Sequence, residues 1–224
     1  MQSWKDIFPK KGEIHFAGAL ENNEDTGTLQ YLASTAMEAG FSTRVLDMQA
    51  LDLQNGRFFD PAGELVNRCF KLYPWEWMVD ESPDGCLAEM EWLEPIWKLV
   101  MSNKAILATL YELFPDSPYV LPCYLSRPRS GLFCKKPVFS REGHNVSVVD
   151  IRDWEEYVRI AETEGDYNTG AYVYQEYAEP TAYSGRYPVI GSWIIGGEAA
   201  GIGIRENRME VTDNLSEFVP HIIG

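Results

Sequence analysis

The sequence predicts an α/β fold in which a layer of parallel strands comes first and an antiparallel region follows. Near the N-terminus, an apolar strand pattern at residues 13–20 leads into a helical pattern at 26–40 and a second strand pattern at 42–48. This order is typical of two parallel strands joined by a crossover helix. Near the C-terminus, two strand patterns flank Gly196-Gly197, a dipeptide that favours a tight hairpin turn.

The composition is that of a folded protein. The chain has 224 residues, of which 45% are hydrophobic, so it can form one large domain or two small ones. The 13% aromatic content argues against disorder. The sequence shows neither a signal-peptide pattern nor an apolar run of the roughly 18 residues typical of a membrane span. We therefore expect a cytoplasmic protein with reduced thiols.

The charge balance narrows the expected partners. A formal net charge of -15 makes nucleic acid and anionic membrane unexpected partners, because both require basic patches. A cationic small substrate such as a polyamine would suit an acidic protein, although surface acid can also serve solubility alone. The four cysteines form no CxxC pair and the three histidines are scattered, so no zinc site is predicted.

In the first half, the predicted helix at 26–40 stops at Gly40. Its apolar face consists of Leu29, Leu32, Ala33, Ala36 and Met37. Residues 65–73 predict a further strand or a short helix. Because the strand–helix–strand segment lacks GxGxxG, it does not predict dinucleotide binding. A loose boundary near residues 80–90 divides the chain into regions 1–85 and 86–224.

In the second half, residues 92–114 have a helical pattern that Ser102-Asn103-Lys104 interrupts. Ser and Asn cap helices, so a break or a new helix start is expected there. A short acidic helix is predicted at 152–163. Strands are predicted at 119–125, 132–138, 145–149, 171–177, 187–195 and 198–205, the last two forming the clearest hairpin.

The most informative segment joins a strand ending in Lys136 to a Ser140-Arg141-Glu142-Gly143 turn and a further strand. A hairpin that clamps nucleotide phosphates would have this arrangement, with a lysine for phosphate charge and a flexible loop that can close. Ser140 and Arg141 could contact anions, and Gly143 would permit close approach. Taken singly, Lys136 could be an exposed strand-end lysine and the loop an ordinary hairpin turn.

Two further segments agree with a nucleotide site. Gln175-Glu176-Tyr177 reads as a strand running into a loop, which offers an adenine a backbone donor, a backbone acceptor and an apolar slot; an ordinary edge strand would look the same. Lys104 would begin the helix after Ser102 and lie at a cleft, or else be a solvated helix lysine.

Charged residues near the C-terminus are also candidates. Arg205 ends a Gly201-Ile202-Gly203-Ile204 run, where glycines permit close approach. It could stabilise charge on a transferred phosphoryl group or pair with a surface carboxylate. The acids Glu210, Asp213 and Glu217 could bind a metal or an ammonium group, or form a solvated face. No Ser-His-Asp order is readable, so a hydrolase with a covalent nucleophile is not predicted.

Taken together and in order, these segments resemble the C-terminal synthetase portion of the glutathionylspermidine synthase family, which are ATP-grasp carbon–nitrogen ligases. The resemblance covers nearly the whole chain from about residue 13. The matching pieces are Lys71-Leu72-Tyr73-Pro74-Trp75-Glu76, Trp92-Leu93-Glu94-Pro95-Ile96-Trp97-Lys98, Ser102-Asn103-Lys104, Lys136-Pro137-Val138-Phe139-Ser140-Arg141-Glu142-Gly143, Gly191-Ser192-Trp193, Gly201-Ile202-Gly203-Ile204-Arg205-Glu206 and Thr212-Asp213-Asn214-Leu215-Ser216.

The resemblance implies an α/β ATP-grasp fold with a partial Rossmann-like pre-ATP-grasp layer (1–85), then a nucleotide-binding region with an antiparallel β clamp (86–224). In such ligases ATP phosphorylates a carboxylate, such as that of glutathione, and an amine such as spermidine attacks the acyl phosphate. The resemblance places Lys104 and Lys136 on the ATP phosphates, and Arg205 near the transferred phosphoryl group. It places Gln175, Glu176, Tyr177 and Ala178 at the adenine hinge, and makes Glu217 a candidate for recognising the amine.

The resemblance also implies a difference from the family. Its members carry an earlier segment with an Arg-x-Asp motif and a Glu-Asn-Asn motif that supply magnesium ligands. Glu21-Asn22-Asn23 echoes the second motif, but it precedes the first predicted helix, so we interpret the echo as accidental and assign no metal ligand. Three hypotheses stay open: a ligase or its nucleotide-binding part, a non-catalytic module that binds ATP or a polyamine, and a truncated chain that needs a partner chain.

Overall fold

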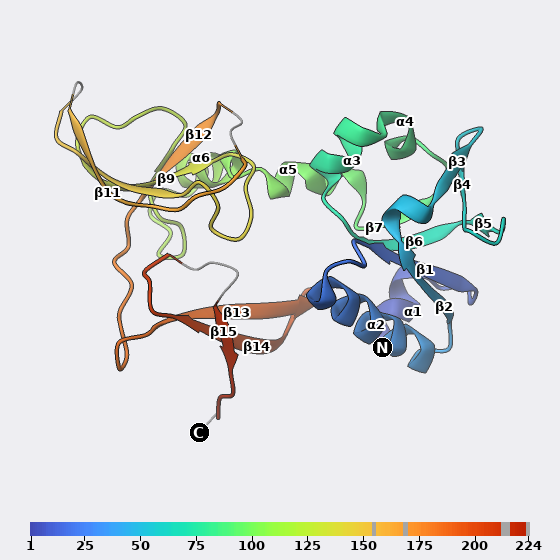
Figure 1. Cartoon of the computed structure of the whole chain (residues 1–224). Coiled ribbons are helices and arrows are strands. Elements are labelled where there is room, and N and C mark those ends of the chain that lie inside the picture. Colours follow the sequence, from blue (N-terminus) through green and yellow to red (C-terminus); the bar gives the residue numbers. More distant parts are fainter. Residues whose placement is uncertain (154–155, 168–169, 212–215, 223–224) are drawn as a thin grey trace. The chain divides into compact units, whose positions relative to one another are not determined.

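The computed structural model describes residues 1–153, 156–167, 170–211 and 216–222 (Figure 1). The chain forms two compact units, Met1–Leu99 and Val100–Gly224. The assignment of 1–85 to a pre-ATP-grasp layer and of 86–224 to nucleotide binding stays a prediction. No helix in the described part of the chain is long and apolar enough to cross a membrane.

The first unit contains a four-stranded parallel sheet in the order β2-β1-β6-β7. The predicted parallel pairing of the first two strands is confirmed, and residues 65–73 are strands rather than a helix. Five of the six β1 residues are buried, because a central parallel strand is covered on both faces. The bounds are β1 (Glu13–Gly18), β2 (Ser42–Asp47), β5 (Leu65–Val66), β6 (Arg68–Leu72) and β7 (Glu91–Leu93).

Helices and a small sheet form the two cores of this unit. On one face Ile14 and Phe16 pack with Leu29 of α2 (Asn23–Glu38) and with Trp4 of α1 (Gln2–Ile7). The second core surrounds Ala17. It is built by the 3-10 helix η1 (Met48–Ala50), the antiparallel β3 (Asp52–Gln54), β4 (Arg57–Phe59) and β5, and the helices α3 (Trp75–Glu81) and α4 (Pro83–Cys86).

Both ends of α2 follow from local chemistry. Asn22 caps the helix, since its Oδ1 accepts hydrogen bonds from the backbone N–H groups of Glu24 (2.8 Å) and Asp25 (3.4 Å). The Glu21-Asn22-Asn23 segment therefore has a structural role. Gly40 ends the helix with a φ of 94°. The prediction that Met37 is buried was wrong: it is 60% exposed, because it lies about 80° around the helix from Leu29.

The second unit contains a five-stranded antiparallel sheet in the order β11-β10-β9-β12-β8. Helix α6 (Ala105–Leu113) packs against it, with Ala108 contacting a core that contains Cys123 and Val173. The bounds are β8 (Cys123–Tyr124), β9 (Gly131–Pro137), β10 (Ser147–Ile151), β11 (Tyr157–Glu162) and β12 (Tyr172–Glu176).

The predicted C-terminal hairpin is confirmed within a three-stranded sheet. Its strands are β13 (Tyr187–Ile195), β14 (Glu198–Asn207) and β15 (Glu217–Val219). Gly196 and Gly197 both adopt positive φ, 62° and 85°. A two-residue hairpin turn of type I′ requires positive φ at both of its central residues. The mixture of one parallel and several antiparallel sheets makes this an α/β protein.

The helix predicted at 92–114 was wrong in its first part. Trp92 belongs to strand β7, where its ring packs edge-on against Phe58 and Trp75 at 5.6 Å. The chain then forms η2 (Ile96–Lys98), α5 (Leu99–Ser102) and α6. Pro95 precedes η2 and cannot donate the hydrogen bond that a continuous helix needs. The break at 102–104 is present, and Asn103 Oδ1 accepts from Ala105 N–H at 2.9 Å.

The acidic helix predicted at 152–163 was also wrong. Residues 157–162 form β11, which pairs antiparallel with β10. The β-branched and aromatic residues Tyr157, Val158 and Ile160 favour a strand, and this preference outweighs the acidic composition. The strand predicted at 119–125 is limited to β8.

The Asn22 cap predicts a stability difference. Asn22→Ala removes the acceptor for two backbone N–H groups and should lower the free energy of unfolding by about 1 kcal/mol. Asn23→Ala is the control, because Asn23 lies in the first turn and does not cap the helix. Urea denaturation followed by circular dichroism measures both. Equal losses in the two variants would contradict the capping role.

Candidate functional site

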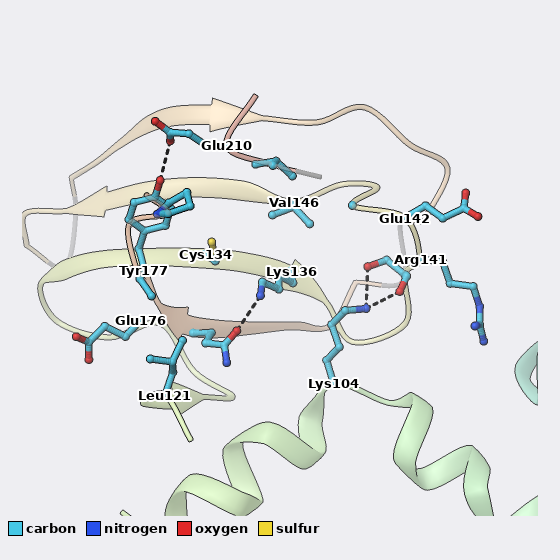
Figure 2. Close-up of a pocket in the computed structure, with 16 residues that line it drawn as sticks. Lys104, Leu121, Cys134, Lys136, Arg141, Glu142, Val146, Glu176, Tyr177 and Glu210 are labelled. Atoms are coloured by element: carbon cyan, nitrogen blue, oxygen red, sulfur yellow. Dashed lines mark hydrogen bonds between the residues drawn. The ribbon is translucent and has the colours of Figure 1, made fainter. Parts of the chain in front are cut away.

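The second unit has a cavity of about 400 Å³ beside β9, β12 and the loop 138–146, which we call the β9–β12 cavity (Figure 2). The structure brings together in its lining all nine residues predicted for the nucleotide. These are Lys104, Lys136, Ser140, Arg141, Gly143, Gln175, Glu176, Tyr177 and Ala178. They come from the start of α6, from two neighbouring strands and from the loop.

Strand alternation directs Lys136 into this cavity. Cys134 and Lys136, two residues apart on β9, both line it. Lys136 Nζ donates a hydrogen bond to Gln175 Oε1 on β12 at 2.7 Å (Figure 2). The amide is uncharged, so this hydrogen bond positions the ammonium group without neutralising it.

Lys104 connects the start of α6 to the loop. Its backbone N–H donates to the carbonyl of Val138 at 2.8 Å. Its Nζ donates to the Ser140 carbonyl at 2.5 Å and to Ser140 Oγ at 3.0 Å (Figure 2). Lys104 is thus held against the loop residue that begins the predicted phosphate-binding turn.

The loop has an unusual backbone. Glu142, Gly143 and Asn145 adopt left-handed φ values of 56°, 74° and 55°, a conformation that only glycine adopts freely. Thr163 holds the turn, because its Oγ1 donates to the Gly143 carbonyl and accepts from Val146 N–H at 2.9 Å. These hydrogen bonds fix the base of the loop on the segment that follows β11.

Asn145 provides a second anchor. Its Nδ2 donates to the Gly165 carbonyl at 2.8 Å, and its Oδ1 accepts from Tyr167 N–H at 2.8 Å. Gly165 lies very close to the loop, since a Cβ atom added there would be 2.5 Å from His144 Cβ. A side chain at position 165 therefore cannot be accommodated unless the loop moves.

Among the lining residues at the end of β12, one has an unused backbone donor. Glu176 N–H donates to the Pro122 carbonyl (2.8 Å) and Tyr177 N–H to the Leu132 carbonyl (3.0 Å). Ala178 is therefore the first residue after β12 whose N–H has no hydrogen-bond partner in the described part of the chain. The predicted adenine hinge requires a backbone donor, a backbone acceptor and an apolar slot; Ala178 offers the donor, and the hinge itself stays a prediction.

Tyr177 and Glu210 form a hydrogen bond at the rim. Tyr177 Oη donates to Glu210 Oε2 at 2.6 Å (Figure 2). Burial raises the pKa of Tyr177 above its ordinary value, and the Glu210 carboxylate raises it further, because ionising the phenol would put two negative charges together. Burial also raises the pKa of the Cys134 thiol, against the opposing effect of Lys136.

Arg205 and Glu217 do not line the β9–β12 cavity. Arg205 lines a separate cavity of about 400 Å³ on the β13–β15 sheet, with its guanidinium 5.6 Å from the Phe218 ring centroid. Glu217 is exposed and accepts a hydrogen bond from Arg186 at 3.3 Å. Their proposed roles stay predictions. Asp213 and the 212–215 part of the Thr212–Ser216 motif lie outside the described residues.

Sequence reasoning missed part of the lining. The additional residues are Leu121, Cys134, Glu142, Val146, Pro180, Glu210 and Val211. Alternation with Lys136 could have identified Cys134. Glu142 lies inside the predicted turn but has no predicted role, and Glu210 is predicted only as a candidate for a metal or an ammonium group. Leu121 lies within the strand predicted at 119–125 and Pro180 lies in a loop, and neither pattern indicates a cavity.

Comparison with known proteins agrees with this architecture. Parallel and antiparallel sheets with a lysine-lined cavity define a mixed α/β protein. The chain matches the family described as glutathionylspermidine synthase preATP-grasp over residues 1–224. It therefore belongs to this family, as the resemblance had indicated.

Named relatives extend the comparison. A provisionally named acid–amine ligase of Haemophilus influenzae is 34% identical over 94% of this chain and 56% of its own length. Trypanothione synthetase of Crithidia fasciculata is 28% identical over 92% of this chain and 35% of its own. The bifunctional glutathionylspermidine synthetase/amidase of Escherichia coli is 26% identical over 89% of this chain and 36% of its own length. The chain thus spans about half or less of the length of these relatives.

The Tyr177–Glu210 hydrogen bond predicts a titration difference. In the wild-type chain, Tyr177 should ionise above the ordinary tyrosine pKa of about 10. Glu210→Gln removes the carboxylate and should bring this pKa down, while burial keeps it raised. Alkaline absorbance titration measures the change, with Tyr177→Phe subtracted to isolate the one phenol. An unchanged Tyr177 pKa in Glu210→Gln would show that the carboxylate does not act on it.

Proposed function

We propose that this chain forms the nucleotide-binding part of an ATP-dependent acid–amine ligase. The observation that carries the proposal is the β9–β12 cavity, which combines two lysines, a glycine-containing loop and a strand-end backbone donor. The names of the relatives, which include an acid–amine ligase and two synthetases, support this reaction class.

The triphosphate would lie at the end of the cavity formed by Lys104, Lys136 and the loop. The ammonium of Lys136 has an amide as its hydrogen-bond partner in the described chain, so it can form charge-assisted bonds with phosphate oxygens. Arg141 and Ser140 lie on the loop above it, and Gly143 lets the backbone approach closely. In this proposal the β9–β10 hairpin is the antiparallel clamp of the ATP-grasp fold.

The adenine would lie at the opposite end, against the segment that follows β12. Ala178 N–H would donate to a ring nitrogen, and Leu121, Cys134 and Val146 would supply the apolar walls. Tyr177 is held away from ionisation by burial and by Glu210, so it presents a neutral ring to the base. The two ends of the cavity thus differ in charge as the two ends of ATP do.

The proposed reaction has two balanced steps. A carboxylate oxygen takes the terminal phosphoryl group of ATP, which releases ADP; an amine nitrogen then attacks the acyl carbon, and phosphate and a proton leave. We propose a peptide-like acid such as glutathione and an amine such as spermidine as substrates, with Arg205 near the transferred group and Glu217 near the amine. A partner chain or segment that completes the site is part of the proposal, because the relatives are longer.

Magnesium is expected of ATP-dependent ligases, where it offsets phosphate charge. In the described residues, no group of three or more His, Cys, Asp or Glu side chains is placed to hold a metal ion. We assign no magnesium ligand in this chain and no step to the ion.

Calorimetry of ATP binding to the 224-residue chain, with and without magnesium, tests the phosphate end. Lys136→Ala should weaken ATP binding about ten-fold or more, because it removes a charge-assisted hydrogen bond. Arg129→Ala is the control: it removes an exposed cation from the loop before β9. A folded wild-type chain that binds no ATP would refute the proposal. Binding without amide formation from glutathione and spermidine would favour the non-catalytic alternative.

The adenine end needs a separate test. Ala178→Pro removes the proposed donor and should weaken ATP binding several-fold while tripolyphosphate, which has no base, binds as before. Ala178→Ser retains the N–H and serves as the matched control. Calorimetry in which ATP and tripolyphosphate compete measures the affinity of each variant for both ligands. If Ala178→Pro weakened tripolyphosphate equally, the backbone donor would not be specific to the base.

A further inference from the structure

A smaller cavity of about 70 Å³ lies on the opposite face of the five-stranded sheet. Its lining consists of Arg127, Lys135, Val149, Ile151, Tyr157 and Tyr174. We propose that this Arg127–Lys135 cavity binds a small oxyanion, either a carboxylate or a phosphate group. The proposal does not depend on nucleotide binding in the β9–β12 cavity.

Lys135 reaches this cavity because successive strand residues point to opposite faces. Lys136 lines the β9–β12 cavity, so its neighbour Lys135 projects to the other side, as does Phe133, which packs with Val149 and Ile151. Lys135 Nζ lies 4.0 Å from the Tyr172 ring centroid. That contact holds the ammonium on the sheet but leaves its donors available to an anion.

Arg127 supplies a second cation with an unused donor. Its guanidinium lies 5.0 Å from the Tyr157 ring centroid, and its Nη2 donates to the Asp153 carbonyl at 3.1 Å. Its Nε is buried and has no hydrogen-bond acceptor in the described part of the chain. Since buried polar groups almost always have partners, an unsatisfied guanidinium N–H points to a ligand that accepts there.

The charge and size of the cavity define the ligand class. Arg127 and Lys135 lack an ion-pair partner among the described residues, and none of the described residues of the lining is a carboxylate. The planar guanidinium fork matches the geometry of carboxylate and phosphate oxygens. The volume equals that of about two liquid water molecules. It therefore admits a single carboxylate or phosphate group and excludes a whole nucleotide.

Two sources could provide such a group: an acidic side chain or peptide terminus, or free phosphate. Acetate and inorganic phosphate represent them as probes. In wild-type chain labelled with ¹⁵N, the Arg127 Nε–H resonance should shift saturably on titration with at least one probe, because the N–H gains an acceptor. Sodium chloride at equal ionic strength is the reference. Saturation with acetate alone identifies a carboxylate site, and with phosphate alone a phosphate site.

Variants locate the binding. Arg127→Gln and Lys135→Gln should each lower the affinity for the bound probe about ten-fold. Calorimetry measures the first variant, and the shift of the Arg127 resonance measures the second. Arg129→Gln, a neighbouring exposed cation outside the cavity, should not lower this affinity. If Arg127→Gln fails to fold, Lys135→Gln alone decides whether the probe binds in this cavity. A shift no larger than that with chloride would overturn the proposal, as would binding lost in Lys136→Gln but kept in Arg127→Gln.

Discussion

Strand β9 places one lysine on each face of the five-stranded sheet of the second unit. It is the middle strand of the five-stranded sheet and pairs with β10 on one side and β12 on the other. Its consecutive lysines, Lys135 and Lys136, therefore serve opposite faces of one sheet. A one-residue shift in pairing would exchange the two faces and bury the wrong side chains. Phe133, buried against Val149 and Ile151, opposes such a shift.

Polar side chains hold the β9–β12 cavity in shape. Thr163 hydrogen-bonds to the backbone on both sides of the left-handed turn, and Asn145 ties the turn to the segment after β11. Lys104 connects the start of the loop to α6. Such anchoring reduces the ordering that a ligand would otherwise have to impose on the loop, which favours binding. The sequence pattern indicated a flexible loop, whereas the structure shows one whose base is fixed and whose exposed residues Arg141 and Glu142 project from it.

Local patterns predicted the elements that carry a clear periodicity or turn signal. The parallel pair β1–β2, the stop at Gly40 and the Gly196-Gly197 hairpin follow from periodicity and turn chemistry in a few residues. The errors have local and non-local causes. Pro95 and the β-forming residues of β11 are local signals that outweigh the helical pattern. Phe58 and Trp75, which pack against Trp92, and β10, which pairs with β11, act from other parts of the chain.

The candidate site also contains some residues that motifs predict and others that only the fold brings together. An ordered set of motifs predicted nine residues that share one cavity, whereas Leu121 and Pro180 enter it from connecting segments that only the fold brings there. Arg205 lies on a different sheet and lines a different cavity, so its place near the transferred phosphoryl group stays a prediction. Motifs identify residue types that a family reuses; they do not give the distance between two sheets.

The close contact at Gly165 affects how substitutions at this position should be interpreted. Gly165 does not line the cavity, yet any side chain there must push against His144 and Asn145 and so displace the turn beneath Arg141. A saturation mutagenesis screen scored on ligand binding would therefore group position 165 with the contact residues. Only a thermal stability screen run in parallel would separate a displaced loop from a lost contact.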